Sequence, residues 1–233
     1  MDLFSALVPF VVFGIPHLAA LAVIGLIGWA LVRHAGHCPE STRRVGQFLA
    51  LFLALLYPAG LMVGWKLGML NRDNVFPCHL CDVAAFCGAG ALWFRNQRLA
   101  ELVWFWGLAG TMNGLITPAL SDSFPSPRFI SFFALHGGVV IAAVYLVVGL
   151  GLRPRQGAVW RAFGWGQVYL LLAALVNVTT GSNYGFLRSK PEQGSLLDML
   201  GPWPYYIAGL EVLGLLLFGL LYLPFKSQGG RPS

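Results

Sequence analysis

The sequence predicts an all-α protein that crosses a membrane about seven times and has almost no soluble domain. Hydrophobic residues make up 57% of the chain and charged residues only 10%, and the mean hydropathy is +0.70. A soluble domain carries roughly 25% charged residues. The apolar residues also fall in long blocks. Because backbone hydrogen bonds in lipid must close within one segment, such blocks predict helices.

Seven blocks approach or exceed the roughly 20 apolar residues that a membrane-spanning helix needs. They are residues 8–32, 45–70, 78–94, 99–120, 129–152, 162–180 and 203–225. The first is too long for the apolar core of a signal peptide, and no small-residue cleavage site follows it, so we expect it to be retained. No long polar segment separates the blocks. Residues 1–225 are therefore expected to form one domain, and residues 226–233 a disordered tail.

The net charge of +6 could suggest a nucleic-acid partner in a soluble protein. Here the positive residues are concentrated in alternate loops between the predicted spans. Ten of the fifteen Lys and Arg lie in the tail and in the loops after the first, third and fifth blocks, namely Arg33, Arg43, Arg44, Arg95, Arg98, Arg153, Arg155, Arg161, Lys226 and Arg231. Positive residues accumulate on the cytoplasmic side of membrane proteins. We therefore expect an outside N-terminus, a cytoplasmic C-terminus and no nucleic-acid partner.

Ionisable residues inside the predicted spans are candidates for a site. An ionisable side chain there costs roughly 2.5–3.5 kcal/mol on insertion scales. With the inferred topology, all six fall in the outer half or near the middle of the bilayer: His17, Lys66, His79, Asp82, His136 and Glu211. This clustering favours one outward-opening pocket. The alternative is a set of separate interhelical contacts, each worth about 0.6 kcal/mol.

Residues 77–82, Pro-Cys-His-Leu-Cys-Asp, form the densest polar string. Pro77 indicates a helix start, which places Cys78 in the first turn and Cys81 one turn later. The positive end of the helix dipole stabilises a thiolate at such a position. With His79 and Asp82, the string contains the parts of a nucleophile, a base and an orienting group. We interpret Cys87 as a small apolar residue and Cys38 as a loop thiol.

Other polar residues have two interpretations each. His136 is predicted at the depth of Cys81, but it could equally be hydrogen-bonded across helices. His17 could cap a kink at Pro16 or line the same pocket. Asn113 and Thr117 share a helix face and could hold an oxyanion or connect helices. The apolar loop 181–202 is expected to fold back over the bundle.

Several strings resemble a known family over nearly the whole chain. They are FGIPHL around His17, PCHLCD at 77–82, GTMNGLITP at 110–118, LHGG around His136, NYGFLRSKP at 183–191 and SLLDMLGPWPYY at 195–206. The chain resembles the YwaF-type bacterial integral membrane proteins. That family is more distantly similar to a eukaryotic TMEM acyltransferase of ether phospholipids and to androgen-induced-type hydrolases of fatty-acid esters.

The resemblance implies a bacterial inner-membrane protein that acts on a membrane lipid, with a Cys or Thr nucleophile, a histidine base and no cofactor. The base would be His136. The nucleophile would be Cys81, the thiol usual in bacterial members, or Cys78, which fits the eukaryotic Pro-Cys-His context. Residues expected to bind substrate or support the site are His17, Lys66, His79, Asp82, Asn113, Thr117, Asn183, Tyr184, Lys190 and Glu211.

Two other classes of function remain open. Cys78 and Cys81 form a CxxC pair that could exchange disulfides, although the second outward cysteine pair that many such oxidoreductases use is missing. The protein could instead be a non-enzymatic lipid-binding membrane protein. We predict no metal site, because the CxxC spacing lacks a second ligand pair at the usual distance. The pattern does not define an oligomeric state.

Overall fold

The computed structural model describes residues 8–191, 194 and 196–230. Within these residues the protein is helical, with no strand beyond an isolated bridge between Pro9 and Asp122. The five longest helical segments are α1 (Ile15–His37), α2 (Pro39–Lys66), α6 (Pro127–Val144) with its π-helical continuation η2 (Tyr145–Gly149), α7 (Ala158–Thr180) and α8 (Tyr205–Tyr222). Each is long and apolar enough to cross a membrane. The predicted all-α membrane fold is confirmed.

The other two predicted spans are also helical, but shorter or interrupted. The third is α3 (Leu80–Phe94), with 15 residues. The fourth consists of α4 (Gln97–Phe105), the π-helical η1 (Trp106–Thr111) and α5 (Met112–Ile116). Single π-helical turns occur often at functional sites. Five segments therefore meet the length of a membrane span by themselves, and the total of seven stays a prediction.

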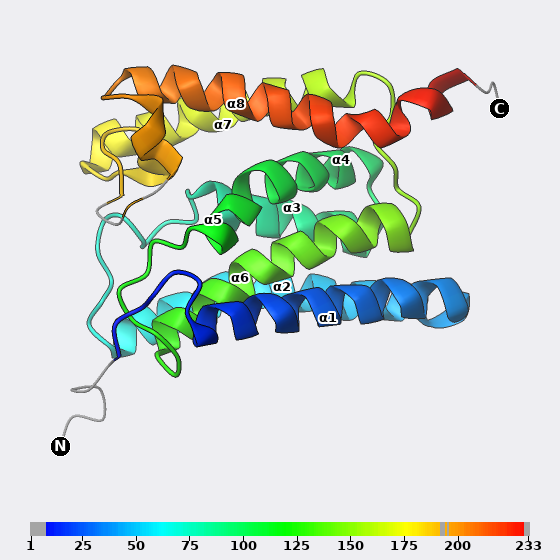
Figure 1. Cartoon of the computed structure of the whole chain (residues 1–233), viewed down its shortest axis with the longest axis horizontal. Coiled ribbons are helices and arrows are strands. Elements are labelled where there is room, and N and C mark those ends of the chain that lie inside the picture. The colour runs from blue at the N-terminus through cyan, green and yellow to red at the C-terminus, as the bar shows by residue number, and fades with distance from the viewer. Residues whose placement is uncertain (1–7, 192–193, 195, 231–233) are drawn as a thin grey trace.

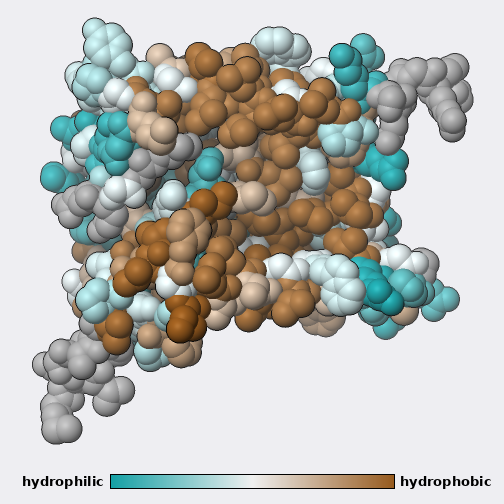
Figure 2. All heavy atoms as spheres, viewed as in Figure 1, coloured by the Kyte–Doolittle hydropathy of each residue, from teal (hydrophilic) through white to brown (hydrophobic). Residues whose placement is uncertain are grey.

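The helices lie roughly parallel in three layers (Figure 1). α7 and α8 form one layer, α3, α4 and α5 the middle one, and α1, α2 and α6 the third. The outer α7–α8 pair meets the rest of the bundle chiefly through α4 and η1. The two ends of the described chain lie at opposite ends of the bundle. Figure 2 shows a hydrophobic surface between two hydrophilic ends, as expected for a protein in a bilayer.

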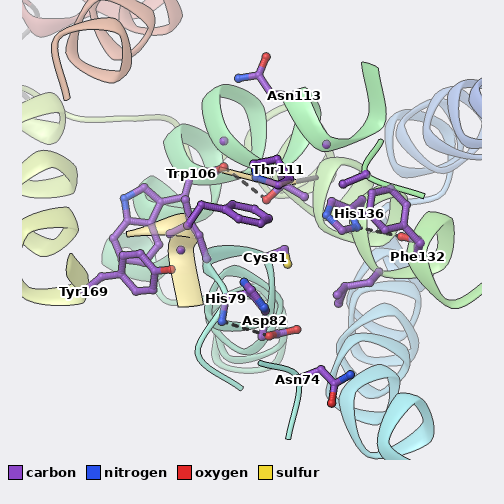
Figure 3. Close-up of a pocket in the computed structure, with 18 of the residues that line it drawn as sticks. Asn74, His79, Cys81, Asp82, Trp106, Thr111, Asn113, Phe132, His136 and Tyr169 are labelled. Carbon is purple, nitrogen blue, oxygen red and sulfur yellow. Dashed lines mark hydrogen bonds between the residues drawn. The ribbon is translucent and has the colours of Figure 1, made fainter. Parts of the chain in front are cut away.

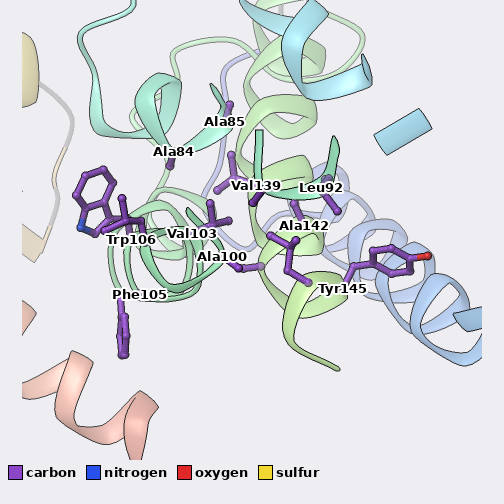
Figure 4. Close-up of a cluster of buried hydrophobic side chains, with 14 of the residues drawn as sticks. Ala84, Ala85, Leu92, Ala100, Val103, Phe105, Trp106, Val139, Ala142 and Tyr145 are labelled. Atoms are coloured by element: carbon purple, nitrogen blue, oxygen red, sulfur yellow. The ribbon is translucent and has the colours of Figure 1, made fainter. Parts of the chain in front are cut away.

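Small residues build the centre of the bundle. Ala84, Ala85, Ala100 and Ala142 are at most 2% exposed, and Figure 4 shows them at the junction of α3, α4 and α6. A Cβ on Gly88 would lie 3.0 Å from Leu53 of α2. Lipid tails are as apolar as leucine, so close van der Waals packing through small residues is what holds membrane helices together.

Three predicted boundaries require correction. The first helix begins at Ile15, not at residue 8, because the preceding segment is held in extended form: Phe10 N–H donates to the Ser121 carbonyl at 2.9 Å. Pro16 therefore starts α1 and does not kink it. Lys66 is the last residue of α2 and exposed, so it lies at the end of the helix and not inside it.

The disorder predicted for the tail, residues 226–233, stays a prediction. A 3₁₀-helix, η5 (Leu223–Gly230), continues α8 over most of it, while residues 231–233 lie outside the described residues. Which end of the bundle faces the cytoplasm is a prediction from the charge distribution.

Candidate functional site

A cavity of about 770 Å³ lies between the α7–α8 pair and helices α2, α3, α5 and α6. Its volume is within the range of small-molecule sites, roughly 300–1,000 Å³. Its walls are mainly apolar. Seven of the thirteen predicted site residues line it: His79, Cys81, Asp82, Asn113, Thr117, His136 and Glu211. Figure 3 shows His79, Cys81, Asp82 and His136 around one space, with Asn113 on the other side of α5.

His136 projects from α6 toward α5 in a fixed orientation. Its Nδ1 lies 2.9 Å from the carbonyl oxygen of Phe132. Because a carbonyl can only accept a hydrogen bond, Nδ1 carries the proton in the neutral ring and Nε2 keeps a free electron pair. The ring also stacks on Phe132, with centroids 3.9 Å apart. On the α5 side it faces Gly114, where the absence of a side chain leaves room for it.

Cys81 is the second residue of α3 and lines the cavity. It therefore lies in the first turn of the helix. Leu80 beside it packs against Gly110, at which a Cβ would come within 2.9 Å of the leucine side chain. Gly110 and Gly114 thus give η1 and α5 a face on which α3 and α6 both approach closely. This face brings the cysteine and histidine helices to one cavity.

His79 and Asp82 complete the start of α3. The backbone N–H of His79 donates to Asp82 Oδ2 at 3.3 Å, and the imidazole Nε2 donates to the Asp73 carbonyl at 2.9 Å. The imidazole also contacts the ring of Tyr184, with centroids 4.9 Å apart. Asp82 is buried. This pair fixes the helix start on which Cys81 lies.

Side chains from the last third of the chain hold the segment before α3. Tyr169 of α7 donates its hydroxyl to the Cys78 carbonyl at 3.1 Å. The Phe76 N–H donates to Tyr184 Oη at 2.8 Å, and the Asn183 N–H donates to Asp73 Oδ1 at 2.7 Å. Burial raises the pKa of Tyr184, so its hydroxyl stays neutral. Asn183 and Tyr184 thus support the site from the loop and do not line the cavity.

The loop after α7 covers one end of the cavity, as predicted. Of its described residues, Gly185, Phe186, Pro191 and Leu197 line the cavity. Asn177 at the end of α7 organises this loop, because its side chain bonds both the N–H and the carbonyl of Tyr184. Residues 192, 193 and 195 of the loop lie outside the described residues.

A comparison with protein-family models matches residues 11–222 to the TMEM164 family. The match covers almost the whole chain. The chain belongs to the TMEM164 family. No curated protein and no solved structure matches it. The similarity to a TMEM membrane family that was expected from the sequence is confirmed, and this TMEM164-family chain is a multi-pass helical membrane protein.

Four other predicted site residues of this TMEM164-family chain do not line the cavity: Cys78, His17, Lys66 and Lys190. His17 is fully buried; its Nε2 donates to the Leu115 carbonyl at 2.7 Å and its Nδ1 accepts from the Phe13 N–H at 2.9 Å. Both ring nitrogens are therefore used in joining α1 to α5. Lys190 pairs with Asp198 at 3.6 Å.

Asn113 and Thr117 line the cavity, but part of their hydrogen-bonding capacity is used within the helix. Asn113 Nδ2 donates to the Ala109 carbonyl at 2.5 Å, and the Thr117 hydroxyl donates to the Asn113 carbonyl at 3.1 Å. The Thr117 hydroxyl has only one proton. Of the two, Asn113 alone retains a side-chain N–H for a ligand oxygen.

Sequence reasoning missed two polar groups of this TMEM164-family chain. Glu101, 1% exposed, binds Arg155 and Arg161, each with a nitrogen 2.9 Å from a carboxylate oxygen. The sequence could have indicated this ion pair, because Glu101 lies near the start of an apolar block and the arginines lie in a later loop. The second is Gln167 of α7, which donates to the Glu211 carboxylate of α8. An uncharged residue in a long apolar block gives little signal.

Proposed function

We propose that this protein is a membrane-embedded lipid acyltransferase or lipid ester hydrolase with Cys81 as nucleophile and His136 as base. One observation carries the proposal: Cys81 and His136 come from different helices and line the same mainly apolar cavity. A cavity with apolar walls and few polar groups suits an acyl chain with its ester. Membership of a TMEM membrane family and the YwaF-type resemblance agree with a lipid substrate.

The reaction would proceed in two steps. His136 Nε2 takes the thiol proton, and the Cys81 sulfur attacks the ester carbonyl of a lipid. A C–S bond forms, the ester C–O bond breaks, and the proton on the imidazole passes to the leaving alkoxide. In the second step a hydroxyl group or water attacks the thioester and restores the thiol. Asn113, with its remaining N–H, is the candidate donor to the developing oxyanion.

Cys81 is a better nucleophile candidate than Cys78 for a geometric reason. Cys81 lines the cavity, and Cys78 does not. Cys78 also precedes α3, in the segment that Tyr169 and Tyr184 hold by its backbone. We assign Cys78 to the support of the site.

We place the protein in the bacterial inner membrane, with the start of α3 toward the outer leaflet. The positive residues support this orientation, because ten of the fifteen Lys and Arg belong to the opposite side or the tail. The cavity would then receive lipids from the outer leaflet.

The test uses purified protein in phospholipid nanodiscs with a probe for nucleophilic thiols. Wild type and Cys78→Ala should be labelled, and Cys81→Ala should not. With a phospholipid that carries a fluorescent acyl chain, wild type should form a hydroxylamine-sensitive acyl-enzyme that Cys81→Ala and His136→Asn lack. Equal acyl-enzyme in Cys81→Ala would rule out this mechanism.

The same material distinguishes a thiol–disulfide oxidoreductase. Mass spectrometry after alkylation, with and without reductant, reports whether Cys78 and Cys81 form a disulfide. A reversible disulfide together with no acyl-enzyme would favour redox chemistry over acyl transfer.

A further inference from the structure

A polar pair lies on the α7–α8 wall of the cavity, on different helices from Cys81 and His136. Gln167 Nε2 donates to Glu211 Oε2, and both side chains line the cavity. Among the described residues, Glu211 forms no ion pair with lysine, arginine or histidine. A carboxylate inside a membrane span without a cation is costly and typical of a functional position.

The pair presents hydrogen-bond acceptors to the cavity. The amide of Gln167 satisfies one carboxylate oxygen of Glu211, which leaves Oε1 of Glu211 and Oε1 of Gln167 as acceptors without a described partner. Asn113 on α5 and Thr117, directly after this helix, belong to the same cavity. Acceptors of this kind suit a ligand group that donates a hydrogen bond, such as a hydroxyl.

The depth of Glu211 indicates which part of a lipid it meets. Glu211 follows the first residue of α8, Tyr205, by six residues, which is about 9 Å along a helix. Headgroups lie in the outer few ångströms of the bilayer, above the roughly 30 Å hydrocarbon core. A membrane surface at Tyr205 would place Glu211 deeper than a headgroup amine, near the level of the glycerol hydroxyls and ester groups.

Cys81 lies near the start of α3, and α3 and α8 begin at the same end of the bundle (Figure 1). α3 has 15 residues, or about 22 Å, and is shorter than the core of the bilayer. Figure 1 shows the chain before α3 entering the bundle between the α7–α8 layer and the rest before the helix starts. The nucleophile and the Gln167–Glu211 pair thus line one cavity.

We propose that Gln167 and Glu211 bind the free hydroxyl group of a monoacyl glycerolipid, the acyl acceptor. This inference rests on the proposed function and adds the acceptor site to it. The bound hydroxyl oxygen attacks the carbonyl of acylated Cys81, so that a C–O bond forms and the C–S bond breaks. The hydroxyl proton passes to His136 Nε2 and from there to the thiolate of Cys81.

Binding is tested first, without any acyl chemistry. The Cys81→Ala protein in nanodiscs is labelled with a photoactivatable monoacyl glycerophospholipid. Adding Glu211→Gln should reduce labelling at least fivefold. Adding Glu40→Gln, a matched change on an exposed residue of the first turn of α2, should not. An analogue whose free hydroxyl is replaced by hydrogen should compete poorly. Equal labelling of the Glu211→Gln protein, or full competition by the deoxy analogue, would overturn the proposal.

Transfer is tested second. Glu211→Gln should raise the KM for the monoacyl acceptor about tenfold in the transfer from acyl-enzyme formed with a fluorescent diacyl phospholipid, and Glu40→Gln should leave this KM unchanged. Gln167→Met, which removes the amide, should act in the same direction. An unchanged KM in both variants would overturn the acceptor site. If wild type forms no acyl-enzyme, the proposed function fails, and the photolabelling result still decides whether Glu211 binds the hydroxyl.

Discussion

The imidazole of His136 lies directly against Gly114. A Cβ at position 114 would be 2.7 Å from Cδ2 and 3.0 Å from Nε2 of His136. Real Cβ contacts are not that short, so any side chain at position 114 must displace the ring. The ring is held on its other side by Phe132. The orientation of the proposed base therefore depends on a glycine in the neighbouring helix.

Gly114→Ala should lower the rate of acyl-enzyme formation by about 10- to 100-fold, because a shift of about 1 Å in a catalytic group can cost that much. Gly25→Ala is the matched control, since a Cβ there meets nothing within 4 Å. Stopped-flow measurement with a fluorescent phospholipid gives both rates. Wild-type rates in Gly114→Ala would show that His136 need not keep this position.

His17 and His136 should separate stability from activity. His17→Ala removes two hydrogen bonds from a fully buried side chain and should lower the free energy of unfolding by about 2–4 kcal/mol, since each unmet partner costs about 1–3 kcal/mol. The folded fraction should keep its activity. His136→Asn should abolish activity and leave the free energy of unfolding close to that of wild type. Thermal unfolding in detergent and activity per folded molecule are measured for both variants. An inactive but stable His17→Ala protein would contradict this prediction.

Asn177→Ala should loosen the loop over the cavity. The Asn177 side chain, 1% exposed, bonds Tyr184 twice and accepts from the Ser182 hydroxyl. Losing these bonds should destabilise the protein by about 2–4 kcal/mol and increase hydrogen exchange at residues 181–187. Thr179→Ala on the exposed side of the same turn is the control. Unchanged exchange would mean that the loop is held by other contacts.

Glu101→Ala should destabilise the opposite end of the bundle. It leaves Arg155 and Arg161 without the carboxylate that joins them to α4. Breaking a buried ion pair costs about 3–5 kcal/mol; because both arginines are partly exposed, we expect about 2–3 kcal/mol here. Cysteine labelling at Cys81 should persist. A matched Glu40→Ala variant, at an exposed position, should unfold like wild type.

Particular residues show how far the sequence could predict this site. Cys81, Asp82 and His136 were expected in one pocket from their depth alone, and all three line the cavity. The predicted depth of His17 did not show its role. Both of its ring nitrogens bond backbone groups, and it does not line the cavity. The predicted depth of Lys66 was wrong, because α2 ends at this residue. Gln167 gave no signal, since its role depends on the position of Glu211 on another helix.

The sequence by itself determined that the chain is a bundle of membrane helices. In lipid each backbone group must bond within its own segment, so apolar length is sufficient to define a helix. Only the tertiary structure decided which polar side chains share a cavity. That depends on how each helix is rotated and on where glycines such as Gly110 and Gly114 let neighbours approach, and these contacts join residues far apart in the chain.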